Sequence, residues 1–197
     1  MSDKKVLGMS LFGIIKSKEP WHRAHEVGMR ELAKRSGMSE LVDLTQDDNY
    51  FRHFRAALSK IDEYKDLSEE DRVSLRRKQY FERVLDFIRG GDFVDEAFVF
   101  FMKELKRKYR LVLISTGVRE FIDEVLKLAG VEGMFDDVVC LDPYEEDDKR
   151  TVFSRAVNKL GKIDMYVGSD SVKAVCEEFG VSFIKCEGVE ELRRKLV

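Results

Sequence analysis

The sequence has 197 residues, of which 44% are hydrophobic and 37% are charged. That length suits one well-packed domain, or a core domain with a small insertion, and argues against two large independent domains. Only 2 prolines and 13 glycines exclude a low-complexity or collagen-like chain. The 35 Lys and Arg residues nearly balance the 38 Asp and Glu residues, for a formal net charge of -3. This balance removes the electrostatic reason to expect a nucleic-acid partner.

Cysteine use and hydropathy bear on the cellular compartment. Cys140, Cys176 and Cys186 form no C-x-x-C pair and no even framework, which indicates reduced thiols. The apolar stretch at residues 6–15 has no small-residue cleavage site of a signal peptide, and no run reaches the roughly 20 apolar residues that span a bilayer. We therefore expect a soluble, cytoplasmic protein without membrane contact.

Helical periodicity dominates the first half of the chain. Residues 6–12 have the pattern of a buried strand. From Pro20 to about Gly90, apolar residues recur at spacings of three and four, with Ser68 and Asp71 resembling a capping box. The pattern predicts helices at residues 21–35, 48–64 and 68–88.

After Asp92, helices and strands alternate strictly. Such alternation predicts a parallel sheet covered by helices on both faces, and the first strand belongs to the same sheet. The helical block is then an insertion after that strand. The predicted elements are helices at 94–108, 118–128, 151–160, 171–179 and 189–196, and strands at 111–114, 137–141, 165–167 and 181–184.

Ligands of an open α/β sheet bind outside the carboxyl ends of its strands. The residues directly after the strands are therefore the candidates for function. They are residues 10–13, 115–117, 141–143 and 168–171, with Lys149 at the start of the helix between the last two.

These four segments, in this order, resemble the haloacid dehalogenase (HAD) superfamily, most of whose members are phosphatases. The likeness covers essentially the whole chain and implies an α/β fold, a three-layer Rossmann-like parallel sheet with an inserted α-helical cap. It places the core at residues 1–16 and 92–197 and the cap at residues 17–91. Besides the first strand and its Gly turn, the segments that carry it are LVLISTG at 111–117, MFD at 134–136, DKR at 148–150 and YVGSDS at 166–171.

The resemblance also shows where this chain departs from the family pattern. It places Ser10 at the nucleophilic aspartate and Phe12 at the acid/base aspartate, a position where dehalogenases of the family carry an aromatic residue. It places Ser169 and Lys173 at acidic positions that bind Mg²⁺. Asp170 then remains as a single weak metal ligand or, equally, as the acid that caps the following helix.

These substitutions change the chemistry that the site can perform. A serine hydroxyl is neutral, needs a general base and is a poor ligand for a hard dication. The three histidines, His22, His25 and His53, all lie in the inserted segment. We therefore expect phosphatase chemistry to be lost or greatly weakened, and Mg²⁺ to bind weakly at most.

The remaining groups suit an anion. The hydroxyls of Ser115 and Thr116, the backbone N–H groups around Gly117 and the ammonium of Lys149 together could cradle a phosphate. The two hydroxyls could instead cap the following helix.

Three functional hypotheses follow. The first is a phosphatase-like protein with decayed catalytic groups, which binds phosphate or a small phosphorylated metabolite. The second is an active hydrolase, a phosphomonoesterase or dehalogenase-like enzyme that uses Ser10 or a displaced Asp170 with a metal. The third is an interaction module that forms a homodimer through its inserted helices.

Overall fold

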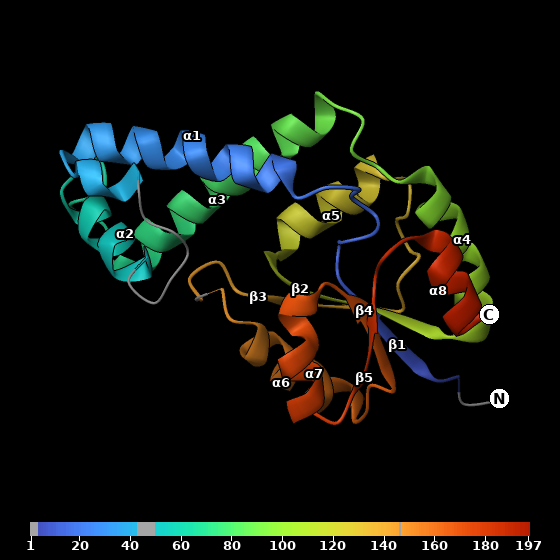
Figure 1. Cartoon of the computed structure of the whole chain (residues 1–197). Helices are drawn as coiled ribbons and strands as arrows, with labels where there is room; N and C mark the ends of the chain where they lie inside the picture. The colour runs from blue at the N-terminus through green and yellow to red at the C-terminus, as the bar shows by residue number, and fades with distance from the viewer. Residues whose placement is uncertain (1–3, 43–49, 146) are drawn as a thin grey trace. The chain divides into compact units, whose positions relative to one another are not determined.

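The computed structural model describes residues 4–42, 50–145 and 147–197. The chain divides into two compact units. An α/β unit consists of residues 1–18, 92–142 and 147–197, and a helical unit consists of residues 19–91 and 143–146. Figure 1 labels the elements of both units.

The α/β unit contains a five-stranded sheet in the order β3-β2-β1-β4-β5, and every neighbouring pair is parallel. The predicted parallel α/β sheet is therefore confirmed. All four residues of β1 are buried, which suits a central strand that is apolar on both faces. The strands are β1 (Val6–Met9), β2 (Arg110–Val118), β3 (Asp137–Leu141), β4 (Met165–Gly168) and β5 (Ser182–Lys185).

Helices cover both faces of this sheet, as Figure 1 shows. On one face, α6 (Lys149–Leu160) and α7 (Lys173–Glu178) contribute to a buried apolar cluster with the strands. On the other face, α4 (Glu96–Lys108) and α5 (Arg119–Leu128) pack against β2, and α8 (Val189–Leu196) packs against α4. A short 3-10 helix, η2 (Asp170–Val172), precedes α7.

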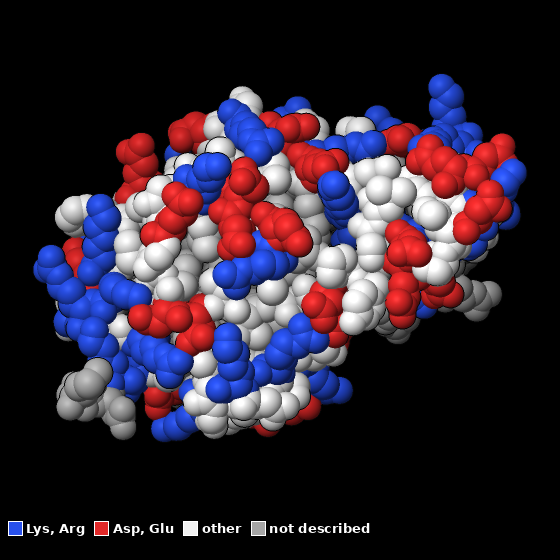
Figure 2. All heavy atoms as spheres, turned by 180° about the vertical axis from the view of Figure 1, so that it is seen from behind, with Lys and Arg blue, Asp and Glu red and all other residues white. Residues whose placement is uncertain are grey.

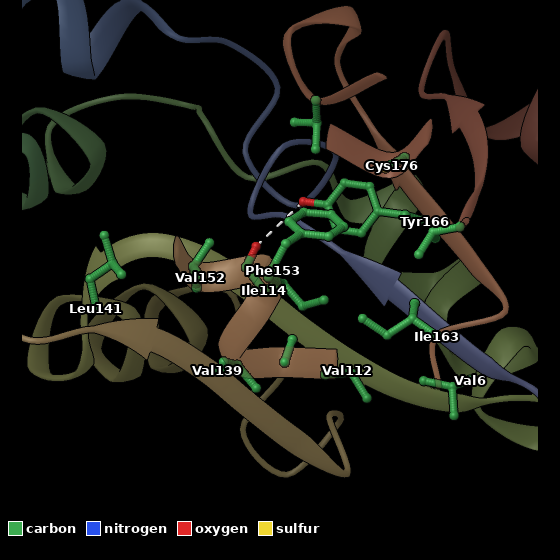
Figure 3. Packing of buried hydrophobic residues seen from close by; sticks show 13 residues of the cluster. Val6, Val112, Ile114, Val139, Leu141, Val152, Phe153, Ile163, Tyr166 and Cys176 are labelled. Atoms are coloured by element: carbon green, nitrogen blue, oxygen red, sulfur yellow. Dashed lines mark hydrogen bonds between the residues drawn. The ribbon is translucent and has the colours of Figure 1, made fainter. Parts of the chain in front are cut away.

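The ring of Tyr166 lies at the centre of the cluster beneath α6 (Figure 3). Its centroid is 4.8 Å from that of Phe153. A Cβ atom added at Gly8 or Gly168 would come within 2.8 Å or 2.6 Å of this ring. The two glycines in β1 and β4 therefore leave the space that Tyr166 fills.

A tight turn follows β1. Gly13 has φ +112°, and a Cβ atom there would lie 2.6 Å from two atoms of the Phe98 ring. Beyond the turn, Ile15 forms an antiparallel bridge with Val94. Two backbone hydrogen bonds of 2.8 Å flank the bridge, from the N–H of Lys16 to the carbonyl of Phe93 and from the N–H of Asp95 to the carbonyl of Ile14. The turn is thus fixed by a glycine conformation and by packing against α4.

The helical unit has its own apolar core. The Oγ of Ser68 accepts the N–H of Asp71 at 3.1 Å, as the capping pattern predicted. Of the predicted helix at 48–64, residues 48 and 49 lie outside the described residues, and the helix ends at Ser59. The elements are α1 (Glu19–Ser36), η1 (Ser39–Val42), α2 (Tyr50–Ser59) and α3 (Glu69–Arg89).

Two predicted strand ends were wrong. β1 ends at Met9, three residues early, because the chain turns at Ser10. β2 continues to Val118, four residues beyond the predicted end, because β3 continues to pair with it through Val118 and Leu141 after an irregularity. Ser115, Thr116 and Gly117 therefore lie within the strand and not after it.

Acidic and basic side chains lie next to one another over much of the face in Figure 2. This mixed pattern agrees with the nearly balanced charge of the sequence. Among the described residues, no helix combines the length and the apolar character needed to cross a membrane.

Candidate functional site

Ser10 directly follows β1, at the carboxyl edge of the sheet. The register places Met9 beside Leu113 of β2 and Val167 of β4, so Ser10 leaves the sheet between its two neighbouring strands. This is the position that the sequence assigned to the nucleophile. The side chain there is a hydroxyl and not a carboxylate.

The hydroxyl of Ser10 takes part in a local hydrogen-bond network. Its Oγ accepts the N–H of Phe12 at 3.2 Å, and it lies close enough to Tyr166 to affect the pKa of that phenol. The hydroxyl of Tyr166 in turn donates to the carbonyl oxygen of Ile114 at 3.4 Å (Figure 3). Burial raises the pKa of Tyr166 well above its usual value, so the phenol stays neutral and cannot serve as the base that a serine nucleophile needs.

Phe12 lies where the resemblance places the acid/base residue, and it has no titratable group. Its side chain is partly buried, and the ammonium of Lys18 lies 5.8 Å from the ring centroid. This contact is a cation–π interaction of modest strength. Neither Ser10 nor Phe12 can donate a proton to a leaving group as a carboxylic acid does.

The end of β2 presents Ser115 at the same edge. Its Oγ accepts the N–H of Gly117 at 3.1 Å. The N-cap residue of α5 is Val118, which makes no side-chain capping bond, so neither predicted hydroxyl is the N-cap of this helix. The helix-cap explanation of Ser115 is therefore wrong, and its hydroxyl hydrogen can still be donated to a ligand.

Lys149 is the first residue of α6. The preceding residue, Asp148, caps the helix by accepting the N–H groups of Arg150 and Thr151. The half-buried ammonium of Lys149 donates to the carbonyl oxygen of Ser171 at 3.3 Å, and within the described part of the chain it pairs with no carboxylate. Burial lowers its pKa, and Lys18 lowers it further. The nearby Asp147 opposes this shift and partly compensates the cation, whose incomplete solvation still favours an anionic ligand.

The loop after β4 contains Asp170, the one carboxylate predicted as a metal ligand. Its Oδ2 pairs with the ammonium of Lys185 at 2.9 Å. Ser169 is the N-cap residue of η2, so Asp170 is not the N-cap acid of the alternative prediction. Lys173 pairs with Glu177 on α7, at 3.9 Å.

These residues do not fit Mg²⁺, which the fold family implies. Mg²⁺ prefers carboxylates and several further oxygens in octahedral geometry. In the described part of the chain, no three His, Cys, Asp or Glu residues come together in a way that could hold a metal. The one carboxylate of the loop is already paired with an ammonium. The proposed function therefore involves no metal.

Three residues of the candidate site were not identified from the sequence, namely Tyr166, Lys185 and Lys18. The sequence places Tyr166 in a strand and in the YVGSDS segment but does not predict that its ring fills the space left by Gly8 and Gly168. Lys185 ends the edge strand β5, and its pairing with Asp170 depends on the register of β4 and β5. Lys18 is distant from Lys149 in sequence, and no local pattern announces their proximity.

Comparison with known proteins supports the fold. A haloacid dehalogenase-like family hydrolase from Streptococcus pneumoniae matches with a TM-score of 0.61 and 15% identity, covering 99% of this chain and 100% of that one. A HAD phosphatase from Thermococcus onnurineus matches with a TM-score of 0.57 and 18% identity, covering 98% and 97%. The HAD-hydrolase YfnB from Bacillus subtilis, in a structure bound to magnesium, matches with a TM-score of 0.55 and 14% identity, covering 99% of each chain.

Sequence comparison adds less. No protein-family model matches. The regulatory protein RecX from Clostridium acetobutylicum is 36% identical over 98 residues, but the match covers 44% of this chain and 46% of that protein. The chain thus spans about half the length of this curated relative, which is too little to assign a family. From the architecture of the sheet and these structural neighbours together, the chain has the fold of the haloacid dehalogenase-like hydrolases.

Proposed function

We propose that the carboxyl edge of the α/β unit binds phosphate or a small phosphorylated metabolite and does not transfer its phosphoryl group. The observation that carries this proposal is the placement of Ser10. A hydroxyl stands at the position that the resemblance assigns to the nucleophile, where it accepts the N–H of Phe12 and lies near the neutral, buried Tyr166.

Phosphoryl transfer to Ser10 would require removal of its proton. The α/β unit contains no histidine, since all three lie between residues 19 and 91. The neighbouring Tyr166 is held in its neutral form by burial. A serine without a general base is a weak nucleophile at neutral pH, and the proposal therefore assigns the site to binding.

The anion-binding part of the proposal rests on Lys149. An ammonium and a hydroxyl are suitable donors to phosphate oxygens, and such charge-assisted hydrogen bonds are stronger than neutral ones. In the proposed site, Lys149 supplies the charge, and Ser115, Thr116 and the N–H groups near Gly117 supply further donors. We propose that residues 17–91 act as a cap that selects the ligand, as the likeness to capped HAD proteins implies.

The proposal also includes a reducing compartment. Cys140, Cys176 and Cys186 are all free thiols. Free thiols fit the cytoplasm, where we place the protein.

A thermal-shift titration with inorganic phosphate tests binding. We expect phosphate at a hundredfold excess over its Kd to stabilise the protein by roughly 2–3 kcal/mol. Lys149→Met should weaken phosphate binding by roughly tenfold, because it removes a charged donor. The matched control is Lys173→Met, which removes the same charge from an exposed residue that pairs with Glu177.

Hydrolysis of an aryl phosphate in the presence of Mg²⁺ tests the absence of turnover. We expect no release of the phenol above background. Hydrolysis that disappears in Ser10→Ala would favour the active-hydrolase hypothesis and refute the proposal. Equal phosphate affinity in the Lys149 and Lys173 variants would refute the assigned binding site.

A further inference from the structure

We infer that Lys185 is a cation built into the fold in place of a divalent metal, so that anion binding at the carboxyl edge needs no metal. The consequence for anions rests on the proposed function, whereas the role of Lys185 as a built-in cation does not. The inference starts from the mismatch between the residues of the β4 loop and the Mg²⁺ that the fold family implies.

The ammonium of Lys185 lies between two carboxylates. Its Nζ is 2.9 Å from Oδ2 of Asp170 and 3.1 Å from Oε1 of Glu187. A lysine ammonium is charged at neutral pH, and both carboxylates lie within ion-pairing distance of it. An ammonium thus holds together two carboxylates that would otherwise repel each other.

The backbone fixes this arrangement. Lys185 is the last residue of β5 and pairs in register with Gly168, the last residue of β4. The N–H of Cys186 donates to the carbonyl oxygen of Gly168 at 2.9 Å. Both strands therefore end together, and the side chain of Lys185 reaches the loop that starts at Ser169.

The charge balance of the β4 loop explains why the cation matters. Asp170 is the only acidic residue between Gly168 and Val172, and an unbalanced carboxylate there would oppose an anion bound beside Lys149 and Ser171. In a metal-dependent site a divalent ion offsets such a charge. Here Lys185, which also pairs with Glu187, offsets part of this charge with a cation that cannot dissociate.

A titration with Mn²⁺, followed by the electron paramagnetic resonance of the free ion, tests the inference without phosphate. The variant Lys185→Met leaves Asp170 and Glu187 without their shared cation, and we expect it to bind Mn²⁺ roughly tenfold more tightly than the unchanged protein. The gain should vanish in the double variant Lys185→Met with Asp170→Asn. Lys127→Met is the matched control, because Lys127 pairs with Glu124 on α5, and it should not change Mn²⁺ binding at Asp170.

The same variants are then titrated with inorganic phosphate, with and without Mg²⁺. The unchanged protein should bind phosphate equally in both conditions, whereas Lys185→Met should bind it more weakly and regain affinity with Mg²⁺. A urea unfolding midpoint for each variant verifies that it is folded.

The outcomes separate the two proposals. If Lys185→Met gains Mn²⁺ affinity and no variant binds phosphate, the built-in cation stands and the proposed function fails. If phosphate binds but Mn²⁺ affinity is the same in Lys185→Met and Lys127→Met, the role of Lys185 is overturned alone. Phosphate binding by the unchanged protein that rises with Mg²⁺ would also overturn metal independence.

Discussion

The two ends of the parallel sheet use charged side chains in different ways. At the amino ends of the strands, aspartate carboxylates accept backbone N–H groups and so hold neighbouring strands together. Asp164 accepts the N–H of Val6 at 2.8 Å and pairs with Lys162, and Asp136 accepts the N–H of Leu111 at 2.8 Å. These are fixed structural roles for ionised carboxylates.

At the carboxyl ends, hydroxyls and an ammonium replace carboxylates. Ser10 and Ser115 accept nearby backbone N–H groups, and Lys149 lies half-buried without a carboxylate partner among the described residues. The one acidic residue of the β4 loop, Asp170, is paired with Lys185. The strands are thus joined by carboxylates at one end of the sheet, whereas at the other end Ser10 and Ser115 accept backbone N–H groups and Asp170 pairs with an ammonium.

The largest expected effect on the free energy of unfolding comes from the turn at Gly13, which follows the carboxyl end of β1. Gly13→Ala should lower the free energy of unfolding by about 3 kcal/mol, since it combines an unfavourable φ with a clash against Phe98. Gly130→Ala is the matched control, because Gly130 also has positive φ but no atom lies within 4 Å of its added Cβ. Its cost should be about 1 kcal/mol. Urea denaturation measures both, and equal losses would show that Phe98 does not constrain the turn.

A smaller effect is expected at the amino end. The ammonium of Lys162 and the N–H of Val6 hold the pKa of Asp164 below its usual value. A lowered pKa in the folded state contributes stability above about pH 4, and this stability is lost as the pH falls through the folded pKa. Asp164→Asn should therefore cost about 1–2 kcal/mol at pH 7 and progressively less in acid.

The pH dependence of this loss in stability distinguishes the removal of an ionised carboxylate that joins two segments from a simple packing defect. Urea unfolding at pH 7 and at about pH 3 measures it. Asp123→Asn serves as the control, because the exposed Asp123 pairs with Arg119 on the surface of α5. A loss in Asp164→Asn that is the same at both pH values would contradict the assigned role.

The smallest effect concerns the network at Ser10. Tyr166→Phe removes the hydroxyl that donates to the carbonyl of Ile114 and lies near Ser10, and it should cost about 1 kcal/mol. If Ser10 and Tyr166 are hydrogen-bonded, a double-mutant cycle with Ser10→Ala should give a coupling energy of about 0.5–1 kcal/mol. Strict additivity would indicate that the Ser10 hydroxyl is free for other chemistry.

Much of the sheet could be predicted from the sequence, because helices and buried strands have different apolar periods. The strand at Asp137–Leu141 and the helix at Val189–Leu196 have the predicted bounds. The end of β2 was missed because Ser115, Thr116 and Gly117 have no apolar signal. Their strand conformation comes from pairing with β3, which no local pattern encodes.

The candidate site was predictable in part. The order of strand ends brings Ser10, Ser115 and Lys149 to one edge, which follows from the parallel topology alone. The partners of Ser10 and Asp170 were not predictable. Tyr166 and Lys185 reach them through side-chain packing and strand register, and these arise only in the folded chain.

The mass of the intact protein after incubation with an aryl phosphate and Mg²⁺ tests the central claim most directly. If the carboxyl edge only binds its anion, the protein keeps its original mass at every time point and releases no phenol. A phosphoryl adduct that maps to Ser10 would show that this hydroxyl attacks phosphorus, and it would contradict the account.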